Sequence, residues 1–164
     1  MDPAICDTIR DVLASAGRDP VLLTLEITES VLMSEPDAVC ERLTAIRALG
    51  CRISIDDFGT GYSSLASLAR FPIDELKIDQ TFVAALPHDT ATERVARAII
   101  DRAQALSLRT VAEGIETHQQ LHMLTAMGCT TGQGYLFARP MAADAVMSWK
   151  YPTLNVATPV AEAV

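Results

Sequence analysis

The sequence predicts an α/β fold in which strands and helices alternate along the chain. Short apolar runs rich in β-forming residues are separated by longer segments with helical periodicity, and turn residues lie between them. A chain of 164 residues with 49% hydrophobic composition is large enough for one domain with a real core. This alternation favours βα units that share one parallel sheet.

Five strands are expected, at 22–28, 52–56, 75–79, 110–113 and 133–137. The first is preceded by a helix over 2–17 with an apolar face of Ile5, Ile9, Val12 and Leu13. The folded domain is expected to cover 1–149, and residues 150–164, which contain two prolines and no periodicity, to form a flexible tail.

Helix signals lie between the strands. After the first strand, Ser34 is the expected N-cap, Pro36 lies in the first turn and Gly50 follows the last turn. Thr117 and Gln120 predict a capping box for a helix that ends at Gly128. The segment 89–106 has one apolar stripe of Val95, Ile99, Ala103 and Leu106.

Charge and composition narrow the classes of function. A net charge of −8 argues against nucleic acid or an anionic membrane surface as a partner. No apolar run approaches the roughly 18 residues of a membrane span, so a cytoplasmic protein is expected. The cysteines lack metal-site spacing and are expected to be reduced and mostly buried: Cys6, Cys40, Cys51 and Cys129.

Polar residues fall where the predicted strands end. Because the carboxyl ends of parallel strands meet at one edge of a sheet or barrel, these side chains are expected to converge. They are Glu26, Asp56, Asp57, Lys77, Asp79, Glu113 and Gln133. Glu26 points inward if Leu25 and Ile27 face the helices.

Converging carboxylates would repel one another unless a cation lay between them. Their hard oxygen atoms suit magnesium or manganese, and no His or Cys is near enough in sequence to favour zinc. Each acid taken singly could instead cap a helix or lie in a solvated loop, and Lys77 could form an ordinary ion pair with Asp56 or Asp79.

The segment 56–65, with the sequence DDFGTGYSSL, contains the glycines Gly59 and Gly61. Glycines at such positions permit a close approach of the main chain to a ligand or metal, although a tight turn after a strand would need them as well.

Five ordered motifs together resemble the EAL family of cyclic-di-GMP phosphodiesterases. They are LEITE at 25–29, DDFGTGYSSL at 56–65, LKID at 76–79 followed by Phe82 and Val83, AEGIE at 112–116, and QGY at 133–135 with Pro140. The resemblance covers residues 4 to about 149. It implies a TIM-like (β/α) barrel that hydrolyses cyclic-di-GMP to linear pGpG with two divalent cations, Mg²⁺ or Mn²⁺.

The resemblance also implies roles for single residues. The implied metal ligands are Glu26, Asp56, Asp57 and Asp79, the last of which also helps to hold the attacking water. Lys77 would lie near the scissile phosphate, Glu113 would be a further active-site glutamate, and Gln133 would contact the substrate.

Two further acids have implied or expected roles outside the chemistry. Glu29 would secure the 56–65 loop, which in the family links metal binding to dimerisation. Glu116 is expected to be a first-turn acid that favours the helix dipole.

The sequence departs from the family upstream of the Glu26 strand, where neither the Glu-Ala-Leu motif nor a later metal-binding Asn is found. The expected architecture is therefore a partial TIM-like barrel with about the last five strands and their helices, in a fold that typically takes about 250 residues. An unpaired Glu26 strand predicts a homodimer or larger self-association, and the missing ligands predict weak catalysis.

Three interpretations remain open at this point. The chain is part of a metal-dependent phosphodiesterase, or a catalytically inactive module that binds cyclic-di-GMP or a protein, or a truncated product with no function of its own.

Overall fold

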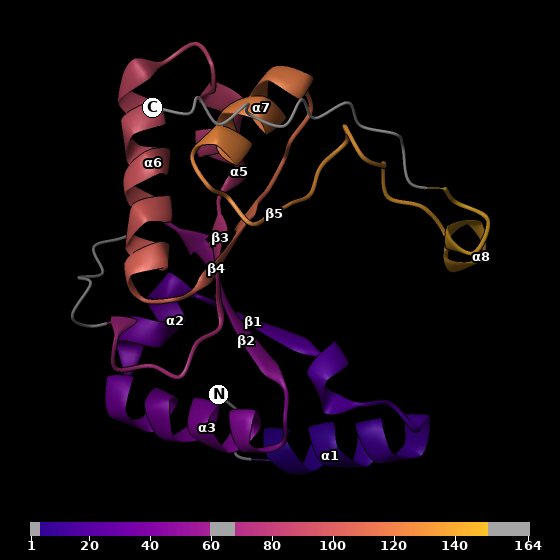
Figure 1. The fold of residues 1–164 in the computed structure, drawn as a ribbon. Coiled ribbons are helices and arrows are strands. Elements are labelled where there is room, and N and C mark those ends of the chain that lie inside the picture. Colours follow the sequence, from indigo (N-terminus) through magenta and orange to yellow (C-terminus); the bar gives the residue numbers. More distant parts are fainter. Residues whose placement is uncertain (1–3, 60–67, 151–164) are drawn as a thin grey trace, which may run out of the picture.

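The computed structural model describes residues 4–59 and 68–150, and its centre is a five-stranded parallel sheet (Figure 1). The strands are β1 (Thr24–Thr28), β2 (Arg52–Phe58), β3 (Glu75–Ile78), β4 (Arg109–Ala112) and β5 (Thr131–Gly132). Their order in the sheet is their order in the chain. This is the arrangement of successive βα units in one part of a barrel, so the predicted fold class is confirmed.

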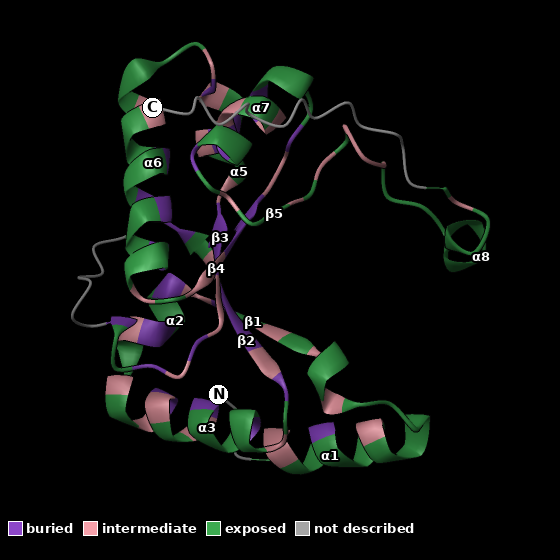
Figure 2. Cartoon of the chain, in the orientation of Figure 1, coloured by how far each residue is buried: buried purple, intermediate pink, exposed green. Residues whose placement is uncertain are grey.

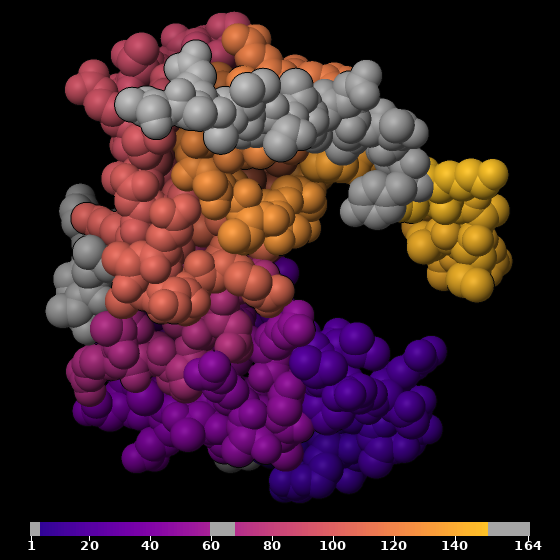
Figure 3. Space-filling model, in the orientation of Figure 1, coloured from indigo at the N-terminus to yellow at the C-terminus, as the bar shows by residue number. Residues whose placement is uncertain are grey.

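The helices are α1 (Ile5–Ala16), η1 (Pro20–Leu22), α2 (Glu29–Ser34), α3 (Pro36–Ala48), α5 (Gln80–Ala85), α6 (Thr90–Ala105), α7 (His118–Ala126) and α8 (Ala143–Val146). Figure 1 shows α8 well apart from the sheet, and Figure 3 shows a hollow between α8 and the N-terminal elements. No described helix is long and apolar enough to cross a membrane.

The core lies around the central strands. Ile53, Ile55, Leu76 and Ile78 have no exposed surface, and Figure 2 shows the buried colour following β2, β3 and β4. Removing these branched side chains from water on both sides of the sheet is the main source of stability for parallel strands. The packed core holds the strands side by side, so that their carboxyl ends lie at one edge of the sheet.

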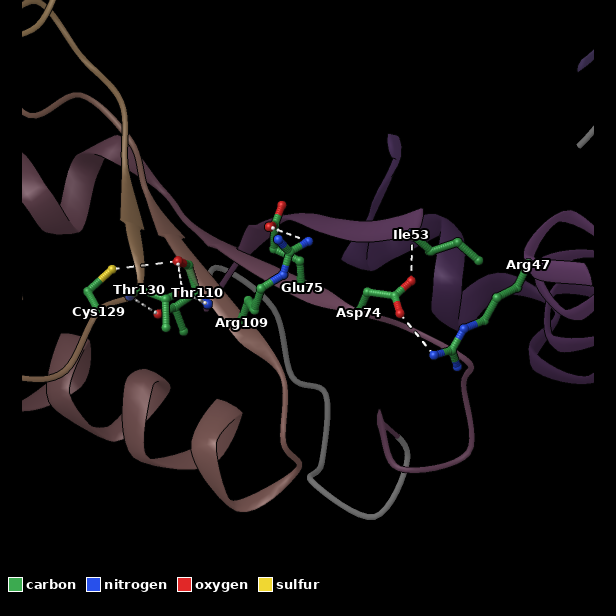
Figure 4. Close-up of polar contacts among 8 residues, drawn as sticks. All are labelled: Arg47, Ile53, Asp74, Glu75, Arg109, Thr110, Cys129 and Thr130. Atoms are coloured by element: carbon green, nitrogen blue, oxygen red, sulfur yellow. Dashed lines mark hydrogen bonds and ion pairs between the residues drawn. The ribbon is translucent and has the colours of Figure 1, made fainter. Parts of the chain in front are cut away.

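Polar contacts hold the amino-terminal ends of the strands in register (Figure 4). The carboxylate of Asp74 accepts hydrogen bonds from the Arg47 guanidinium at 2.9 Å and from the Ile53 N–H at 3.0 Å. Glu75 pairs with Arg109 at 3.2 Å, and the two residues are register partners in β3 and β4. These contacts tie α3, β2, β3 and β4 together at the end of the sheet opposite Glu26, Asp56 and Glu113.

The last strand differs from the prediction. β5 is only Thr131–Gly132, and the segment 133–137 forms a turn in which the Leu136 N–H donates to the Ile115 carbonyl at 2.9 Å. Thr130 extends the short pairing, because its hydroxyl accepts from the Thr110 N–H at 2.8 Å and its own N–H donates to the Thr110 hydroxyl at 3.1 Å (Figure 4).

Two helix predictions and one strand boundary are also corrected. Ser34 does not cap α3 but ends α2, where its hydroxyl donates to the Val31 carbonyl, and Glu35 holds the N-cap position. Pro20 begins a 3₁₀ turn, so β1 starts at Thr24 rather than Leu22. Val95 is 41% exposed, because α6 turns Ala96 and Ile100 inward beside the predicted Ile99 and Ala103.

Other local predictions are confirmed. Thr117 and Gln120 form the capping box of α7, and Gly50 and Gly128 follow helix ends with positive φ. The prediction that the cysteines are mostly buried is wrong, because only Cys51 is buried and the other three are partly exposed. The predicted tail after residue 150 lies outside the described residues.

Candidate active site

Polar side chains at the carboxyl ends of the five strands form one group around a lysine, with three acids in contact with it and one amide in contact with an acid. Glu26 lies in β1, Asp56 in β2 and Lys77 in β3, while Glu113 and Gln133 directly follow β4 and β5. Because the strands are parallel, these positions meet at one edge. The convergence predicted for these five residues is therefore observed.

Lys77 is the centre of the group. Its Nζ lies 2.8 Å from Glu26 Oε2, 3.0 Å from Asp56 Oδ1 and 2.7 Å from Glu113 Oε1. The Lys77 side chain is only 8% exposed. An ammonium has three N–H donors, so three carboxylates use its full capacity. Of the two ion-pair partners considered for Lys77, Asp56 is confirmed.

The contacts of Lys77 decide its protonation. Burial acts first to lower the pKa of Lys77, but hydrogen bonds to Glu113, Glu26 and Asp56 outweigh it, and the net pKa is raised above the ordinary lysine value. Lys77 is therefore a permanent cation at neutral pH.

Gln133 extends the group to the last strand. Its Nε2 donates to Glu113 Oε1 at 2.7 Å, the same oxygen that Lys77 contacts. The position of Gln133 is fixed by its main chain, because its N–H donates to the Ala112 carbonyl at 2.8 Å and its carbonyl accepts from the Ile115 N–H at 3.0 Å. Glu113 is thus held from two sides.

A register shift in β2 sets the direction of the two aspartates. Ile55 pairs with Leu76 and Phe58 with Ile78, so β2 has one extra residue between these pairs. Asp57 adopts a φ of +54° within this bulge and is exposed, while its N–H donates to Asp56 Oδ1 at 3.1 Å. Bulges re-aim side chains in this way, and here Asp56 and Asp57 turn apart.

Asp79 was expected to be the last residue of a strand, but it lies just beyond β3. β3 ends at Ile78, and Asp79 is the N-cap of α5, where Oδ1 accepts from the Thr81 N–H at 2.9 Å and from the Thr81 hydroxyl. It therefore contacts α5 rather than Lys77. Its implied role toward metal or water stays a prediction.

Glu29 and Gly59 form a second contact next to the site. Glu29 is 5% exposed, and its Oε2 accepts from the Gly59 N–H at 3.4 Å. Gly59 has a φ of +102°, and a Cβ on it would lie 2.7 Å from Ile99 Cδ1. The chain thus leaves β2 pressed against α6, and only glycine fits there. Gly61 lies outside the described residues.

Glu116 is placed differently from the prediction. α7 begins at His118 with Thr117 as its N-cap, so Glu116 precedes the helix instead of lying in its first turn. Its N–H donates to Gln120 Oε1 at 2.9 Å, and its exposed side chain borders a pocket.

That pocket, of about 410 Å³, opens beside Glu113 and Gln133. Tyr135 and Arg139 also line it, with the Arg139 guanidinium 4.4 Å from the centre of the Tyr135 ring. Tyr135 belongs to the QGY motif of the sequence, whereas no sequence motif pointed to Arg139. Only the turn that follows β5 brings Arg139 over the aromatic ring.

The carboxylates around Lys77 are also the oxygen ligands that a divalent cation would need. In the described ranges no group of three or more His, Cys, Asp and Glu side chains is arranged to hold a metal ion. The carboxylates instead surround the Lys77 ammonium, so they already converge on a cation. Nearby in β2, the buried Ser54 hydroxyl has no hydrogen-bond partner among the described residues. Hard, convergent oxygen atoms fit Mg²⁺ or Mn²⁺ in chemistry.

Parallel βα units with acids and a lysine at the strand ends define a barrel-type α/β protein with a charged cluster at the carboxyl edge of its sheet. The chain belongs to the EAL domain family, whose model matches residues 1–140. The resemblance inferred from the motifs is thereby confirmed.

Relatives agree with this assignment. The chain is 47% identical over 138 residues to the cyclic di-GMP phosphodiesterase NbdA of Pseudomonas aeruginosa, covering 84% of this chain and 18% of NbdA. It is 39% identical over 148 residues to the cyclic di-GMP phosphodiesterase PdeR of Escherichia coli, covering 90% and 22%. The chain thus spans about a fifth of the length of these relatives.

Solved structures show the same fold. The MucR phosphodiesterase of Pseudomonas aeruginosa in complex with c-di-GMP matches with a TM-score of 0.85 and 44% identity, over 88% of this chain and 58% of that one. BlrP1 of Klebsiella pneumoniae in a manganese and cyclic-di-GMP complex matches with a TM-score of 0.78 and 32% identity, over 85% and 36%.

Proposed function

We propose that this chain carries most of the active site of an EAL-type phosphodiesterase, which hydrolyses cyclic-di-GMP to pGpG with the help of divalent cations. The observation that supports this best is the Lys77 group, which unites Glu26, Asp56 and Glu113 at the carboxyl ends of four neighbouring strands. Sequence identity to cyclic di-GMP phosphodiesterases supports the substrate.

The cations would be held by carboxylate oxygens of Glu26, Asp56, Asp57 and Asp79. When bound, such cations neutralise the charge of a phosphodiester and lower the pKa of a water molecule that attacks it. The chain's own part is to present these oxygens from separate strands. The bulge at Asp56 and Asp57 lets the side chains of two successive residues point in different directions.

Lys77 donates hydrogen bonds at the centre of the site and supplies a fixed positive charge for an anionic phosphodiester. Glu113 orients Lys77, because it is itself held by Gln133. Gln133 keeps one amide oxygen and one N–H beyond this contact for the substrate.

The pocket beside Glu113 suits one base of the nucleotide. Tyr135 offers an aromatic face and is 50% exposed, and Arg139 stacks over it with a positive charge that attracts phosphate. Glu29 acts on the site indirectly in this proposal, because its contact with Gly59 holds the start of the loop that follows Asp57.

A second candidate is a module that binds cyclic-di-GMP without hydrolysis. The arrangement of the acids around an ammonium, rather than around a vacant centre, favours it. Such a module would use the pocket and Arg139 to hold the anionic ligand, since the three carboxylates already occupy Lys77.

We also propose self-association through β1, which is an edge strand in the described sheet. Edge strands present unpaired N–H and C=O groups to other chains. Size-exclusion chromatography of the purified chain tests this, and a sharp monomer peak at high concentration would contradict it.

The test of function is incubation with cyclic-di-GMP and Mg²⁺ or Mn²⁺, following pGpG by chromatography. Asp56→Ala should abolish turnover, whereas Asp101→Ala, the same change on the exposed surface of α6, should leave it unchanged. Binding of cyclic-di-GMP without pGpG would support the second candidate. A folded chain that neither binds nor hydrolyses the nucleotide would overturn both.

A further inference from the structure

The Lys77 ammonium and a divalent cation would compete for the same two carboxylates, Glu26 and Asp56. Nζ lies 2.8 Å from Glu26 Oε2 and 3.0 Å from Asp56 Oδ1. The ammonium therefore occupies the position between these two carboxylates that a bound cation would take. Mg²⁺ binds oxygen at about 2.0–2.1 Å, so the same two oxygens cannot enclose a metal while Nζ remains between them. Two positive centres at such short range also repel each other strongly.

The three partners of Lys77 differ in how firmly they are held. The Glu26 side chain is 51% exposed and the Asp56 side chain 26%, so both have room to turn toward an ion. Glu113 is 18% exposed, and the hydrogen bond from Gln133 at 2.7 Å fixes the oxygen that Lys77 contacts. Glu113 is therefore the partner that Lys77 would keep.

We propose that Lys77 is the resident cation of this site, and that a divalent metal binds Glu26 and Asp56 only by displacing Lys77 onto Glu113. This inference rests on the proposed function, since it concerns the same carboxylates. It gives Lys77 a role before any substrate arrives: it keeps the acids together in the metal-free protein and sets the threshold concentration for metal.

The experiment measures Mn²⁺ binding in the absence of nucleotide, by titration calorimetry and by the electron paramagnetic resonance signal of free Mn²⁺. Lys77→Met removes the competing charge and keeps a side chain of similar length. The chain has two lysines, and Lys150→Met makes the same change at an exposed position near the end of the described residues. It is the matched control for net charge.

Lys77→Met should bind Mn²⁺ about tenfold more tightly or better, because the site loses a positive charge within a few ångströms of the metal position. Lys150→Met should bind like the unchanged protein. Lys77→Arg, which keeps the charge, should also fail to gain affinity.

The other outcomes separate the displacement of Lys77 from the existence of the metal site. Equal affinity in the Lys77→Met and unchanged proteins would overturn the displacement and leave the metal site standing. No Mn²⁺ binding to either protein would overturn the metal site and with it the proposed metal-dependent function. If Lys77→Met does not fold, the comparison is made in a Glu113→Gln background, where fewer acids face one another. The gain there should be at least as large, because Lys77 has lost the carboxylate onto which it would move, and no gain would overturn the displacement.

Discussion

Replacing Gln120 with methionine should destabilise the protein strongly although it changes no residue at the candidate site. The Gln120 side chain is 6% exposed, and its Oε1 accepts from the N–H groups of Glu116 and Thr117 at 2.9 and 3.0 Å. Its Nε2 donates to the Val83 carbonyl at 3.1 Å. One amide therefore fastens the segment after Glu113 to the helix that Asp79 begins.

The expected loss is about 3 kcal/mol, from three hydrogen bonds at about 1 kcal/mol each. Val83 has no exposed surface, and its carbonyl would keep the hydrogen bond from the Leu86 N–H at 3.1 Å but lose the one from Gln120. Glu116 and Thr117 are exposed, so water would replace part of their lost bonds. Because the whole stability of a domain is about 5–15 kcal/mol, such a loss is easily measured.

Urea denaturation followed by circular dichroism gives the free energy of unfolding of each variant. Gln119→Met is the matched control, since Gln119 is the exposed neighbour in α7 and the change should stay within about 0.5 kcal/mol. If both variants lose the same stability, Gln120 does not join these segments and the reasoning is refuted.

Two further predictions concern backbone and pH. Gly59→Ala should cost roughly 2 kcal/mol more than Gly17→Ala in the same assay, because a Cβ at Gly59 would meet Ile99 and Phe82 at a φ of +102°. Gly17 has open space at a φ of +60°, which lies in the left-handed region that other residues can adopt. Equal costs would mean that neither packing nor backbone conformation constrains Gly59. Asp89→Ala should lower stability at neutral pH, because the Thr92 hydroxyl and then the Ala91 N–H of α6 stabilise the carboxylate and lower the pKa of Asp89. A lowered folded pKa stabilises the protein above the unfolded value, so the difference between the two proteins should vanish as the pH falls well below 3.8, and a difference that persists there would contradict the capping role.

The sequence by itself determined the fold class, the family and the identity of the converging residues. Period-two apolar runs and capping signals are local, so β2 and the capping box of α7 could be predicted without knowing what they pack against. The convergence of Glu26, Asp56 and Lys77 was predictable because parallel strands end at one edge.

Only the tertiary structure decided how these residues divide their contacts. Asp79 was expected to end the strand at 75–79, but β3 ends one residue earlier and Asp79 caps α5. The extra residue in β2 that separates Asp56 from Asp57 depends on pairing with β3, which no local pattern reveals. Likewise, the turn after β5 arises from long-range bonds to Ile115, which override the strand-like composition of 133–137.

The same reason explains the centre of the site. That Lys77 contacts three carboxylates depends on distances across β1, β2, β3 and β4, because side chains from separate strands meet only after the sheet has formed. Sequence specifies which charges are present and at which strand ends they lie. The packed sheet decides which of them touch, and so makes Lys77 the cation around which the acids are arranged.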